Sequence, residues 1–462
     1  MQRNSYVHVI LILLALALLI TGPFLGSGLW SLRQAKSATD PARAADLYET
    51  AASRLFWRDD LWERAGILAQ QAGQAERAAA LLERAPSLSA QGWLSLGQAR
   101  LQAGLPEAAL PAFQSSIEQA ASPQAYAGIA EIQRRQGEIE AERAALENQL
   151  LLDPADAAAQ YRLGLLLSLL DINSAMTHFQ LAAQLDAEYA SVYETLRSTL
   201  TLAELDPTET GRLVTLGRGL GLAGEWDLAK RAFESAVAAD AGNAEAWAWL
   251  GEARQHLGGY GLSDLDQALA LDPNSVVVRG LRGLYWARSG NHRQALAEYQ
   301  AAAALEPDNP AWQASLGDAY ARLGDLELAI ATFLRATELA PDDAGYWLVL
   351  AAFCLETGVH IEDVGLPAAQ KAVDLTPEDP RALDILGWAQ LSLGKYYTAE
   401  QILLAALALS PDFTSAHLHL ALVYLQTGDR TAAHAHLLRI KEIDPNGASG
   451  QQADMILKQY FP

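Results

Sequence analysis

The stretch SLGDAYARLGDLELAIATFLRATELAPDD, residues 315–343, contains two amphipathic segments, a glycine between them and a proline after them. Apolar and small residues recur in each segment at helical spacing, whereas glycine and proline are residues at which helices commonly end. The stretch therefore predicts a helix–turn–helix hairpin. Whether it occurs once or many times decides the architecture of the chain.

The hairpin recurs along the sequence. In the C-terminal half a proline ends each copy at intervals of 34, 34, 36, 34 and 34 residues, at Pro273, Pro307, Pro341, Pro377, Pro411 and Pro445. The turn glycine recurs as well, at Gly73, Gly104, Gly137, Gly224, Gly258, Gly290, Gly324, Gly358, Gly394 and Gly428. A fixed period of this length is typical of solenoids built from stacked hairpins.

The pattern resembles the tetratricopeptide repeat, a helix–turn–helix module of 34 residues. The quoted copy carries its signature residues at Leu316, Gly317, Tyr320, Ala329, Phe333, Ala336 and Pro341. Small residues at Gly317 and Ala329 allow the two helices to approach, and Phe333 fills the gap between neighbouring hairpins. The resemblance implies an all-α, right-handed superhelical solenoid, and we count about eleven repeats in it.

The repeat pattern divides the chain into six segments. Residues 1–30 are a signal anchor or transmembrane segment, 31–58 a linker and N-terminal capping helix, 59–189 repeats 1–4, 190–209 an irregular helical spacer, 210–447 repeats 5–11, and 448–462 a C-terminal capping helix. The spacer has room for one helix and not for a hairpin. We therefore expect the superhelix to change course there.

The N-terminal stretch Val7 to Trp30 has no charged residue apart from neutral His8. As a helix it would be about 36 Å long, enough to cross a bilayer. The unbroken apolar core, residues 9–20, also fits a cleaved signal peptide with small residues at 26–28 near the cleavage point. We expect a retained single-pass anchor that contacts the lipid bilayer through residues 7–30, with the cleaved signal as the alternative.

The side of the membrane depends on two opposing signals. Arg3 precedes the span, whereas Arg33, Lys36 and Arg43 follow it, and that count favours a cytoplasmic body. A short tail before an apolar core is instead the usual layout of an export signal. We expect the body to be extracytoplasmic.

Charge and chemistry argue against several function classes. The formal net charge of −22 opposes nucleic-acid binding, and the single cysteine, Cys354, permits no intrachain disulfide or cysteine-based metal site. The G-x-G-x-x-G match at residues 219–224 runs through the end of a repeat's first helix into its turn, whereas a dinucleotide loop would need a preceding strand. We therefore expect a protein that is not an enzyme and has no cofactor.

Four histidines lie in the last repeat, at His417, His419, His434 and His436. Residues two apart on a helix point in different directions, so neither pair can chelate one ion by itself. One imidazole from each helix could still meet across the hairpin. We expect packing histidines and no metal.

Members of the family usually bind peptides or helices on the concave surface formed by the first helix of each repeat. In the last three repeats this surface is apolar, with Leu348, Leu355, Trp388, Leu391, Leu418, Leu422 and Leu425. Such a strip would bind a hydrophobic segment or an amphipathic helix. The alternative is that the C-terminal helix covers it.

The sequence therefore predicts a membrane-tethered scaffold or adaptor for other proteins, most simply an assembly or accessory subunit of a bacterial membrane complex. The alternative is a cleaved, exported repeat protein that binds a small molecule or glycan. A mature N-terminus near residue 29 would favour that alternative.

Overall fold

The computed structural model describes residues 22–461 of the 462-residue chain. Over this range every regular element is a helix, and there is no strand. None of the helices within residues 22–461 is long and apolar enough to cross a membrane. The predicted span lies outside the described residues up to residue 21, and residues 22–30 belong to a helix that continues to residue 35.

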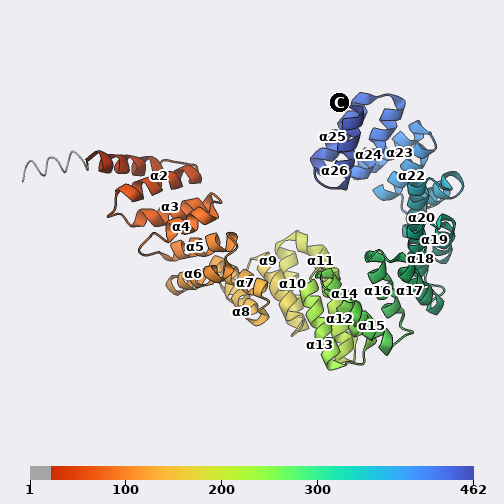
Figure 1. The fold of residues 1–462 in the computed structure, drawn as a ribbon, viewed down its shortest axis with the longest axis horizontal. Coiled ribbons are helices and arrows are strands. Elements are labelled where there is room, and N and C mark those ends of the chain that lie inside the picture. The colour runs from red at the N-terminus through yellow and green to blue at the C-terminus, as the bar shows by residue number, and fades with distance from the viewer. Residues whose placement is uncertain (1–21, 462) are drawn as a thin grey trace, which may run out of the picture. The chain divides into compact units, whose positions relative to one another are not determined.

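Most helices form antiparallel pairs joined by short turns, and within residues 60–185 and 244–443 each pair packs beside the next (Figure 1). The first four pairs are α3 (Asp60–Gln71) with α4 (Ala75–Leu82), α5 (Ala90–Gln102) with α6 (Pro106–Gln119), α7 (Pro123–Gln136) with α8 (Ile139–Leu152), and α9 (Ala157–Leu167) with α10 (Ile172–Leu185).

Seven further pairs follow in the second half of the chain. They are α12 (Glu209–Leu222) with α13 (Trp226–Ala239), α14 (Ala244–His256) with α15 (Leu262–Leu271), α16 (Val276–Arg288) with α17 (His292–Leu305), α18 (Pro310–Leu323) with α19 (Leu326–Leu339), α20 (Ala344–Thr357) with α21 (Leu366–Leu375), α22 (Pro380–Ser392) with α23 (Tyr396–Leu409), and α24 (Thr414–Thr427) with α25 (Arg430–Ile443). The remaining elements are α2 (Pro41–Arg54), η1 (Ala187–Tyr189), α11 (Ala190–Leu205), η2 (Ile361–Gly365) and α26 (Ala448–Tyr460).

The turns within the pairs depend on glycine. Among the described residues, the glycines with positive φ are the ten predicted turn glycines, from Gly73 at 74° to Gly428 at 89°. Glycine adopts this left-handed conformation without the steric cost that a Cβ atom brings. The one non-glycine residue with positive φ in this range is His360, which lies in the repeat that is two residues longer than the period and precedes η2.

The signature residues pack as the repeat pattern predicts. A Cβ atom on Gly317 would lie 2.5 Å from Cε1 of Phe333, and one on Gly97 would lie 2.7 Å from the Phe113 ring. Ala329 and Phe333 are buried in the same core cluster. The two helices of a repeat therefore approach because one carries glycine where the other carries a large side chain.

The structure differs from the sequence analysis at the N-terminus. Residues 31–40 were assigned to a linker before a lone capping helix, but residues 22–35 form a helix that packs against α2. Leu32 and Ala35 of this helix share a core with Ala45 and Tyr48 of α2. The helix before α2 therefore supplies a partner that α2 was not expected to have.

The chain divides into two compact units, Met1–Ser235 (unit 1) and Ala236–Pro462 (unit 2). The division lies inside α13 and not at the predicted spacer, where α11 packs against both α10 and α12. Two contacts explain why α12 and the start of α13 stay with unit 1. Nη1 of Arg162 is 3.2 Å from the Glu225 carboxylate, and Nη2 of Arg231 donates to the Gly137 carbonyl at 2.8 Å.

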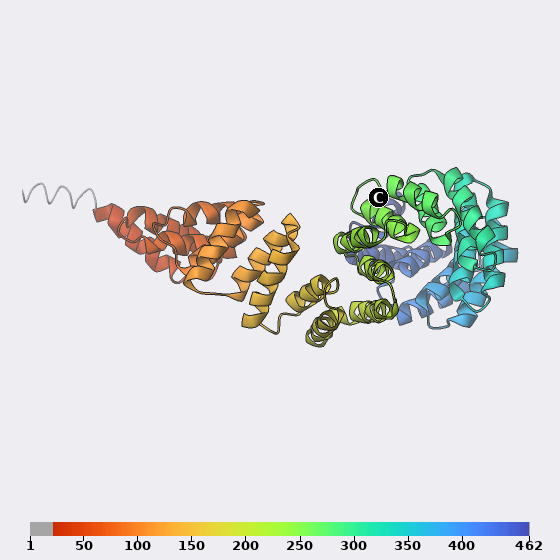
Figure 2. The same cartoon turned by 90° about the horizontal axis from the view of Figure 1, so that it is seen from below.

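In unit 2 the helix pairs follow a curved path from green to blue (Figure 2). The path ends at α26, which packs against α25 and α24. Ala453 of α26 is buried against Leu437 and Ile440 of α25. Since α26 contacts the last pair in this way, it lies at the end of the stack, where the first helix of a further repeat would lie.

Candidate functional site

The predicted groove residues lie on three neighbouring first helices of unit 2. These helices, α20, α22 and α24, contact one another in succession. Five of the seven predicted side chains are half-buried: Leu348, Trp388, Leu391, Leu422 and Leu425. We call these five residues the apolar groove.

The other two predicted residues lie deeper. Leu355 is 6% exposed and belongs to a core cluster shared by α19, α20, α21 and α22. Leu418 is 8% exposed and packs in a cluster with Leu437, Ile440 and Ala453. These two side chains hold neighbouring helices together and do not face a ligand.

A pocket of about 940 Å³ opens beside Leu348. Leu348 and the exposed Val349 contribute apolar surface to it, and the start of α22 contributes Asp379 and Arg381. The Asp379 carboxylate accepts hydrogen bonds from the Arg381 backbone at 2.8 Å and from its guanidinium at 2.8 Å. The hydrogen bond from the Arg381 guanidinium lowers the pKa of Asp379, so this carboxylate stays ionised at the rim of an apolar surface.

A buried carboxylate–imidazole pair lies next to the apolar groove. Oδ1 of Asp384, a residue 3% exposed, is 2.7 Å from Nδ1 of His419, and Oδ2 accepts from the Ser415 hydroxyl at 2.6 Å. The His419 ring stacks on the Trp388 indole with centroids 4.9 Å apart. Since a carboxylate oxygen accepts, Nδ1 of His419 is the donor in this pair. The pair joins α22 to α24 and fixes the position of Trp388.

A second histidine contact joins α24 to α25. His417 Nε2 lies 2.9 Å from the Pro411 carbonyl, so this nitrogen carries a proton, and Nδ1 of a neutral His417 accepts. His436 Nδ1, 2.8 Å away, is then the donor. Burial, with a smaller contribution from His417, lowers the pKa of His436, so its ring favours the neutral form. Imidazoles from the two helices do meet across the hairpin, but they meet through a hydrogen bond.

No metal centre accompanies these histidines. Across residues 22–461 there is no group of three or more histidine, cysteine, aspartate or glutamate side chains placed to hold an ion. Cys354 is buried, and burial raises its thiol pKa to about 11. A thiol of that kind is a poor nucleophile because the reactive thiolate is scarce at neutral pH.

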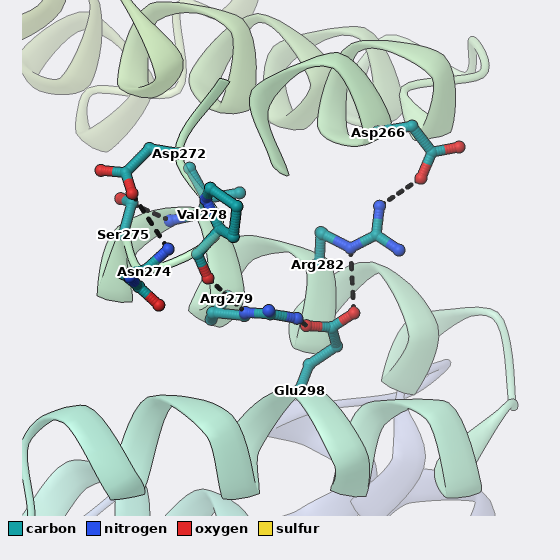
Figure 3. A network of polar contacts seen from close by, with 9 residues as sticks. Asp266, Asp272, Asn274, Ser275, Val278, Arg279, Arg282 and Glu298 are labelled. Carbon is teal, nitrogen blue, oxygen red and sulfur yellow. Dashed lines mark hydrogen bonds and ion pairs between the residues drawn. The ribbon is translucent and has the colours of Figure 1, made fainter. Parts of the chain in front are cut away.

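A network of ion pairs lies earlier in unit 2 (Figure 3). Asp266 of α15 and Glu298 of α17 approach the Arg282 guanidinium of α16 from opposite sides, and Nε of Arg282 lies 3.0 Å from Glu298. Arg279 reaches the second oxygen of the same glutamate at 2.8 Å. Arg282 and Glu298 are 9% and 8% exposed, whereas Asp266 is exposed, so the network bridges three successive helices from a buried ion pair to the surface.

A similar contact joins α14 to α16. Glu252, 4% exposed, accepts from Arg288 at 2.8 Å and contacts Nε2 of His256 at 3.1 Å. Arg288 also donates to the Gln255 side chain at 3.0 Å. We call the residues of these two networks on α14, α16 and α17 the polar segment: Glu252, Gln255, Arg279, Arg282, Arg288 and Glu298.

Unit 1 contains a polar pocket of about 620 Å³ between α7, α8, α9 and the start of α13. Its lining includes Arg134, Arg162, Arg231, Glu142 and Glu225. Both carboxylates contact Arg162, which lies 3.0 Å from Glu142 through Nη2 and 3.2 Å from Glu225 through Nη1. Because the central arginine is paired on both sides, these contacts mainly stabilise the return of α13 toward the α7–α8 turn.

Sequence reasoning considered the four histidines of the last repeat without Asp384 and missed the pair that Asp384 forms with His419. A usable signal was present, since the two residues are 35 apart, which is one repeat plus one residue. In a solenoid this spacing places two side chains on neighbouring first helices at almost the same height. The ion pairs of the polar segment give no comparable signal, because charged residues at helical spacing are usually solvated.

With this geometry in place, the comparisons with known proteins can be stated. A tetratricopeptide repeat family model matches residues 94–157, 281–344 and 363–412, and a second model with the same description matches 390–454. The chain contains tetratricopeptide repeats. Proteins built from these repeats are generally non-catalytic scaffolds for protein interactions, and the repeats therefore imply protein partners.

Several solved structures are similar to the chain. The APC/C hetero-tetramer Cut9-Hcn1 is 16% identical, with 96% of each chain covered and a TM-score of 0.46. Yeast Tom70 is 15% identical, with 95% of each chain covered and a TM-score of 0.42. MamA from Desulfovibrio magneticus is 23% identical over 37% of this chain and 95% of its own, with a TM-score of 0.33. No curated protein matches the sequence.

Proposed function

We propose that this tetratricopeptide-repeat protein is a membrane-tethered scaffold that binds a hydrophobic segment or amphipathic helix of a partner protein in the apolar groove. The observation that carries the proposal is the exposure of the five groove residues. They come from three adjacent helices and remain half-buried, beside a pocket of about 940 Å³, although the helices that carry them are well packed. Apolar side chains that remain partly in water on neighbouring helices are candidates for contact with a partner.

The position of α26 supports an open groove. The described part of the C-terminal helix packs against α24 and α25 at the end of the stack. Leu348 and Trp388 lie on α20 and α22, outside the core cluster that α26 shares with Leu418. The groove is therefore left for a partner.

We further propose that residues 7–30 are a retained anchor and that the body is extracytoplasmic, as an assembly or accessory subunit of a bacterial membrane complex. One contact supports retention. A Cβ atom on Gly28 would lie 2.9 Å from Cβ of Arg54, so this part of the helix fits closely against α2. Cleavage near residue 29 would remove Leu25 and Gly28 from that contact, which disfavours the exported, cleaved alternative.

Isolation of the tagged full-length protein from native membranes in mild detergent tests the proposal. Mass spectrometry should find a constant set of companion proteins and an N-terminus at Met1 or Gln2. The double variant Trp388→Asp, Leu422→Asp should lose the companions while it keeps the anchor. A chain that begins near residue 29 and has no companion would contradict the tethered scaffold.

A matched control separates the groove from a general loss of apolar surface. Leu404 and Leu438 lie on the second helices α23 and α25 and are 40% and 44% exposed. The variant Leu404→Asp, Leu438→Asp adds the same two charges and should keep the companions. Protease treatment of intact cells tests the side of the membrane, since protection of the body until lysis would exclude an extracytoplasmic location.

A further inference from the structure

The first helix pair of unit 1 consists of helix 22–35 and α2, and it differs from the other pairs in what it exposes. Gly28, Leu32 and Ala35 are buried on the side that faces α2. The opposite surface carries Leu29 and Trp30, which are 57% and 61% exposed. The helix is thus fixed to the solenoid along one side and presents large apolar side chains on the other.

A second group of aromatic residues lies where α2 ends. Phe56 and Trp57 are 78% and 53% exposed and form an edge-to-face pair with ring centroids 5.1 Å apart. Phe24, which is 50% exposed, lies under the guanidinium of Arg54, 5.9 Å from its ring centroid. Since helix 22–35 runs antiparallel to α2, these residues gather at the end where residue 22 begins. We call Phe24, Leu29, Trp30, Phe56 and Trp57 the aromatic end.

The tryptophans make this end distinctive. The chain has 11 tryptophans, all within the described residues, and Trp30 and Trp57 are the two that are exposed. The others are at least partly buried by neighbouring helices. Tryptophan is enriched at membrane–water interfaces because its ring is apolar while its N–H group prefers water.

The charge of this region also differs from that of the whole chain. Residues 22–58 contain five basic side chains (Arg33, Lys36, Arg43, Arg54 and Arg58) and three acidic ones (Asp40, Asp46 and Glu49), a net charge of +2 against −22 for the chain. Two of the three acids are already paired, because Arg77 lies 2.6 Å from both Asp46 and Glu49. Arg58 is itself paired with Asp60, 2.7 Å away, so the basic side chains that the first helix pair contributes to this surface are Arg33, Lys36, Arg43 and Arg54.

We propose that the aromatic end lies in the headgroup region of a bilayer that contains anionic lipids and holds the first repeat against the membrane. This inference rests on the tether proposed above. The occupant is a lipid surface because the chain before residue 22 is an apolar run without a charged residue from Val7 to Ile20. Insertion of this run into a bilayer places the membrane–water interface at the aromatic end. The basic side chains there attract anionic headgroups.

Labelling of the full-length chain with an environment-sensitive fluorophore tests the proposal. Trp30→Cys and Trp57→Cys place single labels on the aromatic end, and Tyr260→Cys places one on a loop of unit 2, where Tyr260 is 90% exposed. The native Cys354 is buried, and its thiol pKa is raised to about 11, so it should label slowly. Each protein is reconstituted in phosphatidylcholine vesicles, with and without phosphatidylglycerol, that carry a quencher near the headgroup.

The expected result has three parts. The chain floats with the vesicles, labels at 30 and 57 lose fluorescence to the quencher, more strongly with phosphatidylglycerol present, and the label at 260 does not. A chain that floats while all three labels stay unquenched would overturn the aromatic end as a lipid surface and leave the tether standing. A chain that does not float would overturn the tether and this inference together.

A second variant tests whether misfolding accounts for the quenching result. Phe56→Ser changes the most exposed aromatic residue of the set and adds no label. It should leave the melting curve unchanged and reduce quenching of the label at 30. Unchanged quenching in this variant would contradict a contact made by the whole aromatic end.

Discussion

The polar segment and the apolar groove belong to the same solenoid in unit 2, yet they differ in chemistry. In the polar segment, the buried Glu252 and Glu298 pair with arginines of the neighbouring helix. In the apolar groove, the five side chains remain half-buried. One repeat pattern thus supports two kinds of surface, because the packing residues fix the helices and leave the remaining positions free to vary. The contacts of the polar segment join neighbouring helices of the stack, whereas the apolar groove is the surface that we propose binds a partner.

The largest effect should follow from breaking the polar segment. Arg282→Ala removes the cation between Asp266 and Glu298 and leaves Glu298, 8% exposed, with Arg279 as its partner. Removing one partner of a buried ion pair typically costs about 3–5 kcal/mol, and the loss here should lie at the lower end of that range because Arg279 still pairs with Glu298. Urea denaturation should show this loss. The exposed pair Arg335–Glu338 provides the control, since Arg335→Ala should cost less than about 1 kcal/mol. Equal losses would contradict a structural role for the polar segment.

The seven predicted groove residues should fall into two classes. Substitution of a buried residue should lower the free energy of unfolding more than substitution of a half-buried residue. Leu355→Ala creates a cavity in the core of α20 and should cost about 2–5 kcal/mol of unfolding free energy. Leu422→Ala removes a half-buried side chain and should cost less than about 1.5 kcal/mol. After correction for the loss of stability, Leu422→Ala should weaken partner binding more than Leu355→Ala does. Equal destabilisation by both changes would mean that Leu422 also belongs to the core.

A smaller effect is expected at the junction of α22 and α24. Asp384→Ala removes the acceptor for His419 and Ser415, and a hydrogen bond to a charged group contributes about 1.5–3 kcal/mol. Ser415→Ala removes one of the two hydrogen bonds and should cost less than the Asp384 variant, about 1.5 kcal/mol. The Asp384 variant should also change Trp388 emission, since His419 stacks on that indole. Normal emission would show that the pair does not position Trp388.

The smallest effect is a pH dependence at the α24–α25 hairpin. Burial lowers the folded-state pKa of His436, so the unfolded chain takes up the proton first as the pH falls. The stabilising contribution is complete above the unfolded value of about 6.5 and is lost as the pH falls toward the folded value. His436→Phe should reduce the dependence of denaturation midpoints on pH below 6.5. An unchanged profile would contradict a neutral, buried His436.

Much of the fold could be predicted from sequence because the residues that recur in each repeat determine its turns and the packing of its helices. The glycines at ten of the eleven turns and the pair Gly317 and Phe333 encode backbone conformation and close packing directly. The first helix pair was missed because residues 22–30 are apolar and also satisfy the pattern of a membrane span. Burial of Gly28 against α2 is a tertiary contact that hydropathy alone does not reveal.

The candidate site was only partly predictable. A residue's position in the repeat identifies the first-helix face. It does not distinguish Leu355, which packs between helices, from Leu422, which remains half-buried. That distinction depends on the angle between neighbouring pairs, which no single repeat specifies. The division of the chain inside α13 has the same origin, because the contacts of Arg162 and Arg231 join residues 63 and 94 positions apart.

The central claim is that partners bind the apolar groove, and photocrosslinking in native membranes tests it most directly. A photoreactive amino acid is placed at Leu422 in the apolar groove, at Gln255 in the polar segment and at Leu438 on the second helix α25. Our account predicts that a partner protein crosslinks to position 422 and to neither of the other two. Crosslinks from position 255 or 438, with none from 422, would contradict it.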